Sequence, residues 1–295
     1  MQKLIKQAFT LIELLVVIAI IGILSGLIVV TMNGVTQKAN VAKAQVFSNS
    51  LRNALMLNLV SEWKLDQVSS NQVLDSWGSN IGTLSDAEGA CDSTHCPQLQ
   101  TTGCVYNKCL YFDGTDYISF GDVLDIGTSD LTISVWVKPS LPFSGTKGVI
   151  GKANNGTGDG RYSICVSSDS KIRGIFDSGA GLTVDSINNL ATDWNLLTAT
   201  WDRDGDMKLY LNGKFENSIS ISAGNGQNYN TTMPFLIGSY QIDGYYFIGS
   251  IDDARIFFSV LPTSQIKEQY YAGINSLLTN KNISAKEHVR LLANK

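Results

Sequence analysis

Five cysteines carry the most versatile side-chain chemistry of the chain, and four of them fall within 19 residues. The four are Cys91, Cys96, Cys104 and Cys109. Such a cluster is either a disulfide knot or a zinc site, but its spacing lacks the Cys-x-x-Cys pairs typical of zinc, and His95 is the single histidine nearby. Because the N-terminal residues predict export, we favour two disulfides and leave their pairing open. Cys165 alternates with apolar neighbours and is expected to be a buried free thiol.

Carboxylates are the second group that could do chemistry, and the sequence shows no catalytic arrangement of them. A retaining glycosidase needs two carboxylates about 5–5.5 Å apart on one strand face, and the globular part contains no Glu-x-Asp-x-x-Glu pattern. Asp202, Asp204 and Asp206 alternate around Gly205, which is typical of a solvated turn. The Gly-x-Ser-x-Gly motif of serine hydrolases is also missing from the sequence. We therefore expect that the protein is not an enzyme.

The N-terminal segment has the composition of a membrane anchor that follows a short basic leader. Residues 14–32 form a run of 19 residues without charge or proline, close to the ~20 residues that cross a bilayer as a helix. Lys3 and Lys6 would hold the preceding residues in the cytoplasm. Glu13 lies at the start of the apolar run, where a carboxylate is costly and therefore usually functional. Its natural partner is the free α-amino group of a neighbouring subunit.

Over about 30 residues, this segment resembles the class III signal and N-terminal helix of type IV pilins and type II secretion pseudopilins. It has a basic leader, a small residue, the sequence Phe-Thr-Leu-Ile-Glu and an apolar run. The resemblance implies that a prepilin peptidase cuts between Ala8 and Phe9 and N-methylates Phe9. It also implies that Glu13 sets the registry between subunits. The family usually has glycine before the cut, whereas this chain has Ala8, and no proline interrupts its helix.

Two simpler interpretations of the N-terminal segment explain less. Ala42-Lys43-Ala44 fits the cleavage site of an ordinary secretory signal, yet it lies well beyond the end of a full-length span. A single-pass anchor without polymerisation would leave Glu13 unexplained. We therefore expect a leader peptide at residues 1–8 and a pilin-type helix at residues 9–60, with the membrane span at residues 9–32. The second half of this helix carries an apolar stripe formed by Phe47, Leu51, Leu55 and Leu59.

From Trp63 onward the apolar period changes from that of a helix to that of a strand. Alternation over residues 131–137 predicts a half-buried strand. A second alternating run ends at Asn212-Gly213, which predicts a tight hairpin turn. Twenty-four of the 27 glycines follow residue 77, so many short segments are separated by turn signals. This pattern is typical of an antiparallel β-sandwich.

Five segments in this part resemble the laminin G-like, concanavalin A-like jelly-roll family in their order and spacing, over about 210 residues. The segments are Trp63 to Asp66 with Asp75 and Gly82, Leu110 to Gly114, Leu131 to Pro139, Trp194 to Lys214, and Phe247 to Ile256 with Leu261 and Ile266. The cysteine cluster is an insertion before Leu110. The resemblance implies an all-β antiparallel jelly roll at residues 61–273, followed by a C-terminal tail at residues 274–295. The fold class is then α+β overall.

The jelly-roll resemblance also implies a binding function, commonly for glycans or proteins and sometimes with Ca²⁺. We expect no required cofactor. Asp75 and Asp252 match recurring acidic positions of the family, where Ca²⁺ is the candidate ligand and structural hydrogen bonding is the alternative that we favour. Exposed aromatic rings would stack on sugars or peptides. The candidates are Tyr229, Tyr240, Tyr245 and Tyr246.

Charge is divided unequally, with a net of +3 on residues 1–44 and −7 on the rest. The globular part that follows the N-terminal helix, which we call the head, is acidic, and this argues against nucleic-acid binding by the head. We therefore predict a minor pilin or adhesin of a type IV pilin-like surface filament, whose head binds an extracellular glycan or protein. Its expected partners are other pilin subunits, the prepilin peptidase and the pilus assembly machinery.

Before assembly, this subunit would lie in the inner membrane as a single-pass protein with an extracytoplasmic head, and afterwards at the cell surface. The alternative is a pseudopilin that serves type II secretion or DNA uptake. A less favoured alternative is a membrane-anchored ectodomain that processes carbohydrate.

Overall fold

The computed structural model describes residues 11–12, 14–22, 58–88, 91–92, 95–152, 161–177, 181–240 and 244–293. The chain divides into two compact units, Met1–Met56 and Leu57–Lys295. The predicted processing site at Ala8 and Phe9 lies outside the described residues, as does Glu13.

The described part of the first unit is helical at residues 11–12 and 14–22. Within it, nine large apolar side chains are between 45% and 85% exposed, from Leu11 to Ile21. The described helix therefore presents apolar surface around its whole circumference. Among the described residues, no helix combines the length and hydrophobicity needed to cross a membrane.

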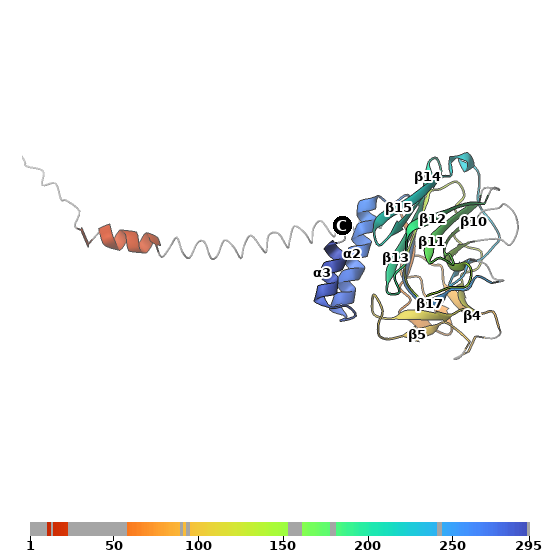
Figure 1. Ribbon diagram of the computed structural model, residues 1–295, viewed down its shortest axis with the longest axis horizontal. Helices are drawn as coiled ribbons and strands as arrows, with labels where there is room; N and C mark the ends of the chain where they lie inside the picture. The colour runs from red at the N-terminus through yellow and green to blue at the C-terminus, as the bar shows by residue number, and fades with distance from the viewer. Residues whose placement is uncertain are drawn as a thin grey trace, which may run out of the picture. The chain divides into compact units, whose positions relative to one another are not determined.

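The second unit is an antiparallel sandwich of two sheets with few helices (Figure 1). Sheet A contains, in spatial order, β15 (Lys214–Ser220), β14 (Asp206–Leu211), β13 (Asn195–Trp201), β8 (Leu131–Pro139), β17 (Ile248–Phe257), β6 (Cys109–Asp113) and β5 (Gln98–Gln100), with β1 (Leu59–Trp63) paired to β17. Sheet B contains β12 (Leu182–Asn189), β11 (Lys171–Asp177), β10 (Arg161–Val166), β9 (Lys147–Lys152), β16 (Phe235–Ile237), β7 (Asp116–Ser119), β4 (Gly82–Asp86), β3 (Gln72–Val73) and β2 (Val68–Ser69). Several strands that pair are distant in the sequence, such as β8 with β17 and β16 with β7, as in a jelly roll.

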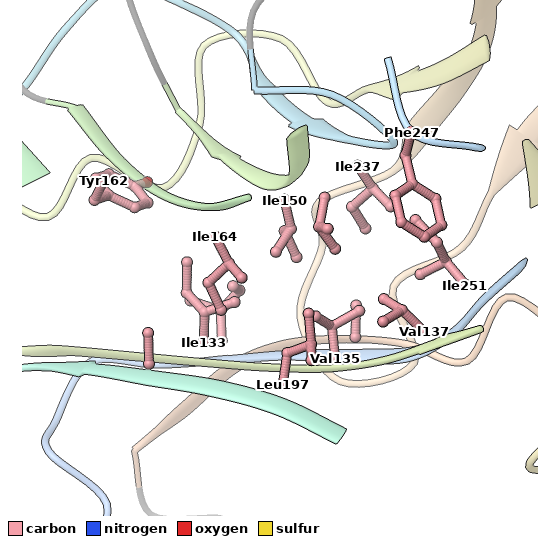
Figure 2. Close-up of a cluster of buried hydrophobic side chains, with 14 of the residues drawn as sticks. Ile133, Val135, Val137, Ile150, Tyr162, Ile164, Leu197, Ile237, Phe247 and Ile251 are labelled. Atoms are coloured by element: carbon pink, nitrogen blue, oxygen red, sulfur yellow. The ribbon is translucent and has the colours of Figure 1, made fainter. Parts of the chain in front are cut away.

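The main core lies between the facing surfaces of the two sheets (Figure 2). Because side chains alternate along a strand, every second residue of each strand points into this space. Figure 2 shows Ile150, Ile164 and Ile237 of sheet B opposite Val135 and Leu197 of sheet A. The burial of these aliphatic side chains supplies the main driving force for closing the sandwich.

Sheet A is also covered on its outer face, because the chain ends in two helices that pack there. These are α2 (Thr263–Thr279) and α3 (Ala285–Ala293). A second core joins them to the sheet, with Trp136 stacked on Tyr270 at a ring-centroid distance of 5.8 Å. Strand β8, predicted to be half-buried, is therefore buried on both faces. Most of residues 274–295, predicted to be a tail, belongs to these helices.

The cysteine cluster forms two local disulfides, Cys91–Cys96 and Cys104–Cys109. The Cys104–Cys109 loop packs in the second core, where the Trp194 indole N–H donates to the Gly103 carbonyl oxygen at 2.7 Å. Cys165 is free and fully buried. Burial raises the pKa of its thiol to about 12, so it is unreactive at neutral pH.

Local turn chemistry accounts for the hairpin between β14 and β15. Asn212 and Gly213 both have positive φ, 55° and 77°, which is the backbone of the tight turn predicted for an Asn-Gly pair. The Asn212 side chain also accepts the backbone N–H of Leu196 at 2.9 Å. This hydrogen bond fixes the hairpin to the neighbouring strand β13.

Candidate binding face of the sandwich

Three of the four predicted tyrosines come from one segment, which follows β16 and lies on the outer face of sheet B. The rings of Tyr240 and Tyr245 are 5.1 Å apart, and Tyr246 stacks on Tyr117 of β7 at 5.9 Å. Tyr245 is 43% exposed, whereas Tyr240 is only 6% exposed. The segment therefore offers one accessible ring that is supported from below by a second.

Tyr229 lies apart from this group. It is 3% exposed, and its ring packs on Phe176 and on the guanidinium of Arg203, at 4.8 Å and 4.1 Å. Arg203 itself donates to the carbonyl oxygens of Gly224 and Gln227. Tyr229 therefore helps to fix the loop that contains it, which is a packing role and not a ligand-binding one.

Gly148 allows the tyrosine segment, the stretch after β16 that carries Tyr240 and Tyr245, to pack closely on sheet B. A Cβ on Gly148 of β9 would lie 2.5 Å from the backbone nitrogen of Tyr240, closer than side-chain carbons approach other atoms. The Gly148 N–H donates to the Tyr245 carbonyl oxygen at 2.5 Å. Beyond Gly148, Tyr240 covers Cys165 and Ile175, with which it forms a small apolar cluster. The segment is thus held directly on the sheet.

Cross-strand register places an ion pair in the same row of the sheet. Gly148 is opposite Cys165, Cys165 is opposite Arg173, and Arg173 is opposite Asp185. Residues opposite each other across a sheet share a face, so Arg173 and Asp185 lie on the outer face with Tyr240. The Arg173 guanidinium donates two hydrogen bonds of 2.7 Å to the Asp185 carboxylate. This hydrogen bonding raises the pKa of Arg173.

Together these side chains form what we call the tyrosine face, defined by Tyr117, Tyr240, Tyr245, Arg173 and Asp185. Aromatic rings supply flat apolar area, and a partly exposed guanidinium–carboxylate pair supplies directed donors and acceptors. This combination can bind a ligand that is apolar on one side and rich in hydroxyl or amide groups on the other. Sequence reasoning missed Tyr117, Arg173 and Asp185, because their place on this face depends on strand register.

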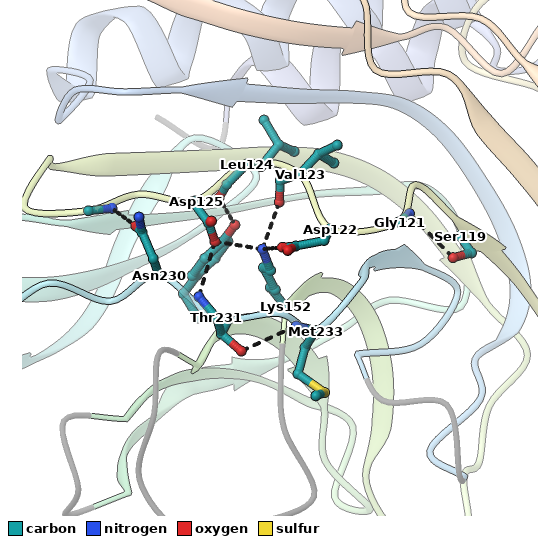
Figure 3. Close-up of polar contacts among 12 residues, drawn as sticks. Ser119, Gly121, Asp122, Val123, Leu124, Asp125, Lys152, Asn230, Thr231 and Met233 are labelled. Carbon is teal, nitrogen blue, oxygen red and sulfur yellow. Dashed lines mark hydrogen bonds and ion pairs between the residues drawn. The ribbon is translucent and has the colours of Figure 1, made fainter.

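Lys152, at the end of β9 away from Gly148, forms hydrogen bonds and ion pairs with a neighbouring loop (Figure 3). It is fully buried, and its ammonium group donates to Asp122 at 2.8 Å, to the Val123 carbonyl oxygen at 3.0 Å and to Asp125 at 2.6 Å. Asp125 also accepts the backbone N–H of Thr231 at 3.2 Å. All three ammonium hydrogens have acceptors, so this group joins two loops and is not a free nucleophile.

The two predicted calcium ligands have structural partners. The Asp75 carboxylate accepts backbone N–H groups from Glu62, Trp77, Gly78 and Asn80 at 2.8–3.2 Å. Asp252 is fully buried and accepts the Tyr106 N–H at 3.0 Å, and burial raises its pKa. Neither belongs to the one group of three carboxylates close enough to share a cation within the described part of the chain.

The fold agrees with the family that most of the head matches. Residues 112–267 match the model of the concanavalin A-like lectin/glucanases superfamily. The chain therefore belongs to that superfamily. Residues 5–29 match the prokaryotic N-terminal methylation motif, so the jelly roll follows a type IV pilin signal. Comparison of the sequence with curated proteins gives no match.

Solved structures of similar fold include several binding domains. Domain 4 of AbnA, an extracellular arabinanase of Geobacillus stearothermophilus solved with arabinotriose, has a TM-score of 0.57 and 22% identity, covering 72% of this chain and 97% of that domain. The binding domain of Paraclostridial Mosquitocidal Protein 1 has a TM-score of 0.57 and 18% identity, covering 75% and 53%. A structure of botulinum neurotoxin type C, whose cell entry depends on two ganglioside molecules, has a TM-score of 0.54 and 16% identity, covering 75% and 53%. At these identities the likeness shows the fold.

Proposed function

We propose that the protein is a minor subunit of a type IV pilin-like surface filament, and that its jelly-roll head binds an extracellular glycan. The observation that carries this proposal is the presence, in one chain, of an N-terminal methylation motif and a concanavalin A-like head. The motif supports a protein that is first anchored in the membrane and then displayed at the surface.

The first unit supports assembly with other subunits. Its described helix leaves nine large apolar side chains exposed, and such a surface is stable only in lipid or against other apolar helices. We assign Glu13 to pairing with the N-terminal amine of a neighbouring subunit. The second unit spans residues 57–295, which is bulky for the repeating subunit of a dense filament and favours a minor role.

The tyrosine face supports a glycan ligand over a protein ligand. A sugar ring has a flat side of C–H groups that packs on an aromatic ring and a rim of hydroxyl groups that bind carboxylates and guanidinium groups. Tyr245 is exposed, and Arg173 and Asp185 are each about one third exposed. Arabinotriose and gangliosides, named for two proteins of similar fold, support a saccharide as the ligand. In this function the head binds and does not cleave.

A glycan array with the unit 57–295 tests the binding part of this proposal. We expect one class of saccharide to bind, and Tyr245→Ala to lower the affinity roughly 3- to 10-fold, because aromatic contacts contribute about 0.5–1.5 kcal/mol. Phe215→Ala is the matched control, since Phe215 is an exposed ring on the edge strand β15 of the other sheet. Binding that survives Tyr245→Ala but not Phe215→Ala would place the ligand elsewhere.

The cellular location of the assembled protein distinguishes a pilus subunit from a pseudopilin. A filament subunit should appear in surface filaments sheared from cells, at low abundance relative to the major subunit. A pseudopilin should remain with the cell envelope, and its deletion should block secretion or DNA uptake without loss of surface binding. Release of product from a polysaccharide by the purified head, abolished by one carboxylate substitution, would show instead that the head is an enzyme.

A further inference from the structure

A group of three carboxylates lies at the tip of the hairpin between β6 and β7. Asp113 ends β6, and Asp116 begins β7. Asp86, at the end of β4, is opposite Asp116 in the β4–β7 pair. Each of the three can offer one oxygen, and these oxygens lie within 4.8 Å of one another. The tyrosine face and the two disulfides involve none of them.

The hydrogen bonds of this group leave one buried oxygen without a partner. Asp116 is 1% exposed, and its Oδ2 accepts the Asp113 N–H at 2.9 Å. Its Oδ1 is fully buried and has no hydrogen-bond partner among the residues that the structure describes. An unsatisfied buried carboxylate oxygen costs free energy comparable to several hydrogen bonds. A ligand that coordinates this oxygen would remove that cost.

Thr115 shows a second deficit of positive charge at the same place. Its hydroxyl oxygen lies 2.9 Å from Asp86 Oδ2 and 2.8 Å from Asp113 Oδ1. A hydroxyl has one hydrogen, so the two carboxylates share it in a three-centre hydrogen bond. One hydrogen between two carboxylate oxygens leaves negative charge that a bound cation would offset.

Within the described part of the chain, no cationic side chain forms an ion pair with this group. None of the ion pairs among the described residues includes Asp86, Asp113 or Asp116.

We propose that Asp86, Asp113 and Asp116 bind a divalent cation, and that the cation is Ca²⁺. All the donors are oxygens, and neither histidine nor cysteine belongs to the group, which disfavours zinc and other transition metals. Asp113 is exposed, so the ion can enter from solvent and keep the water molecules that complete six to eight ligands. Thr115 Oγ1 is placed to be a further ligand.

The cation would fasten the hairpin tip to β4 beside the tyrosine face. Asp116 is followed directly by Tyr117, which stacks on Tyr246. On the other side, a Cβ on Gly238 would lie 3.2 Å from the Asp116 carbonyl oxygen. Gly238 precedes the tyrosine segment, so an ion on Asp116 stiffens both supports of that segment. Cation binding itself does not depend on whether the face binds a glycan.

Calorimetry of the full-length protein in detergent tests this site. After treatment with EDTA and removal of the chelator, we expect one Ca²⁺ to bind per chain and Tm to rise with Ca²⁺ concentration, because a ligand of the folded state stabilises it by mass action. Asp113→Asn, at the exposed member, should fold and lose at least about tenfold in Ca²⁺ affinity. Asp204→Asn is the control, since Asp204 belongs to another acidic group, and it should bind as the wild type does.

Two outcomes would overturn the proposal. In the first, the wild type binds no Ca²⁺ at millimolar concentration and Asp116→Asn is as stable as the wild type or more so, which would show that Asp113 and Asp116 share a proton. In the second, Ca²⁺ binds equally well to the wild type and to Asp113→Asn, which would place the ion elsewhere. Loss of Ca²⁺ binding in both Asp113→Asn and Asp116→Asn, with Asp204→Asn unaffected, would support it.

Discussion

The Trp136 ring occupies the space into which a side chain at Gly273 would project, since a Cβ there would lie 2.2 Å from the ring carbon Cζ2. Trp136 lies on the outer face of β8, and Gly273 lies near the middle of α2. Glycine therefore lets the helix approach the sheet closely enough to bury the indole. This contact closes the second core of the head.

Gly273→Ala should destabilise the head by about 1–3 kcal/mol, the usual cost of overpacking. Alanine has a higher helix propensity than glycine by about 1 kcal/mol, so a helix without this contact would gain stability instead. Urea unfolding followed by tryptophan fluorescence measures the difference. Ala272→Gly, one position earlier on the exposed side of the helix, controls for propensity alone, and a stabilised Gly273→Ala would contradict the close packing.

Cys165 should resist alkylation in the folded protein. Burial raises its pKa from 9.0 to about 12, which leaves about a thousandfold less reactive thiolate at a given pH. Iodoacetamide should therefore label it only after denaturation, while peptide mapping without reductant finds Cys91–Cys96 and Cys104–Cys109. Rapid labelling of the native protein at pH 8 would contradict the burial of this thiol.

The raised pKa of Cys165 predicts a loss of stability at alkaline pH. Below pH 9.0 the thiol is neutral in both states, so it makes no pH-dependent contribution. As the pH rises from 9.0 towards 12, the unfolded thiol ionises while the folded one does not, and the free energy of unfolding falls. Cys165→Ala should lack this component. We expect the difference in the free energy of unfolding between the wild type and Cys165→Ala to change only above about pH 9.

Much of the sandwich could be predicted from local patterns, because strand alternation and turn residues act over a few positions. The β8 alternation and the Asn212-Gly213 turn are examples. The burial of both faces of β8 could not be predicted, because the covering residues Tyr270 and Gly273 lie more than 130 positions away. Alternation of apolar residues along a strand predicts that one of its faces is buried. The other face of β8 is buried only because a helix from a distant part of the sequence packs on it.

The candidate sites were predictable to a smaller extent, since they depend on register. Tyr240, Tyr245 and Tyr246 could be proposed from the sequence because they lie close together in one glycine-rich stretch. Arg173 and Asp185 join them only through the pairing of β10, β11 and β12. Asp86 reaches Asp116 likewise through the β4–β7 pair, whereas the predicted pair Asp75 and Asp252 has hydrogen-bond partners of its own.

Glu13→Val should be inserted and processed but incorporated into filaments at least about tenfold less, because the amine of the neighbouring subunit would lose its charged partner in the membrane. Glu13→Asp keeps the carboxylate and should retain most of the incorporation. Quantitative immunoblotting of sheared filaments, relative to membrane fractions, measures the effect. Equal incorporation of Glu13→Val and the wild type would rule out the registry role.

The chemical identity of the mature N-terminus tests most directly whether this chain is a type IV pilin-like subunit. Mass spectrometry of the protein isolated from its own cells should find a chain that begins at Phe9 and carries one methyl group on its α-amine. An unmethylated chain that begins at Gln45 would show ordinary signal cleavage. A chain that retains Met1 would show a simple anchor. Either result would contradict the proposal that this head reaches the surface as part of a pilin-like filament.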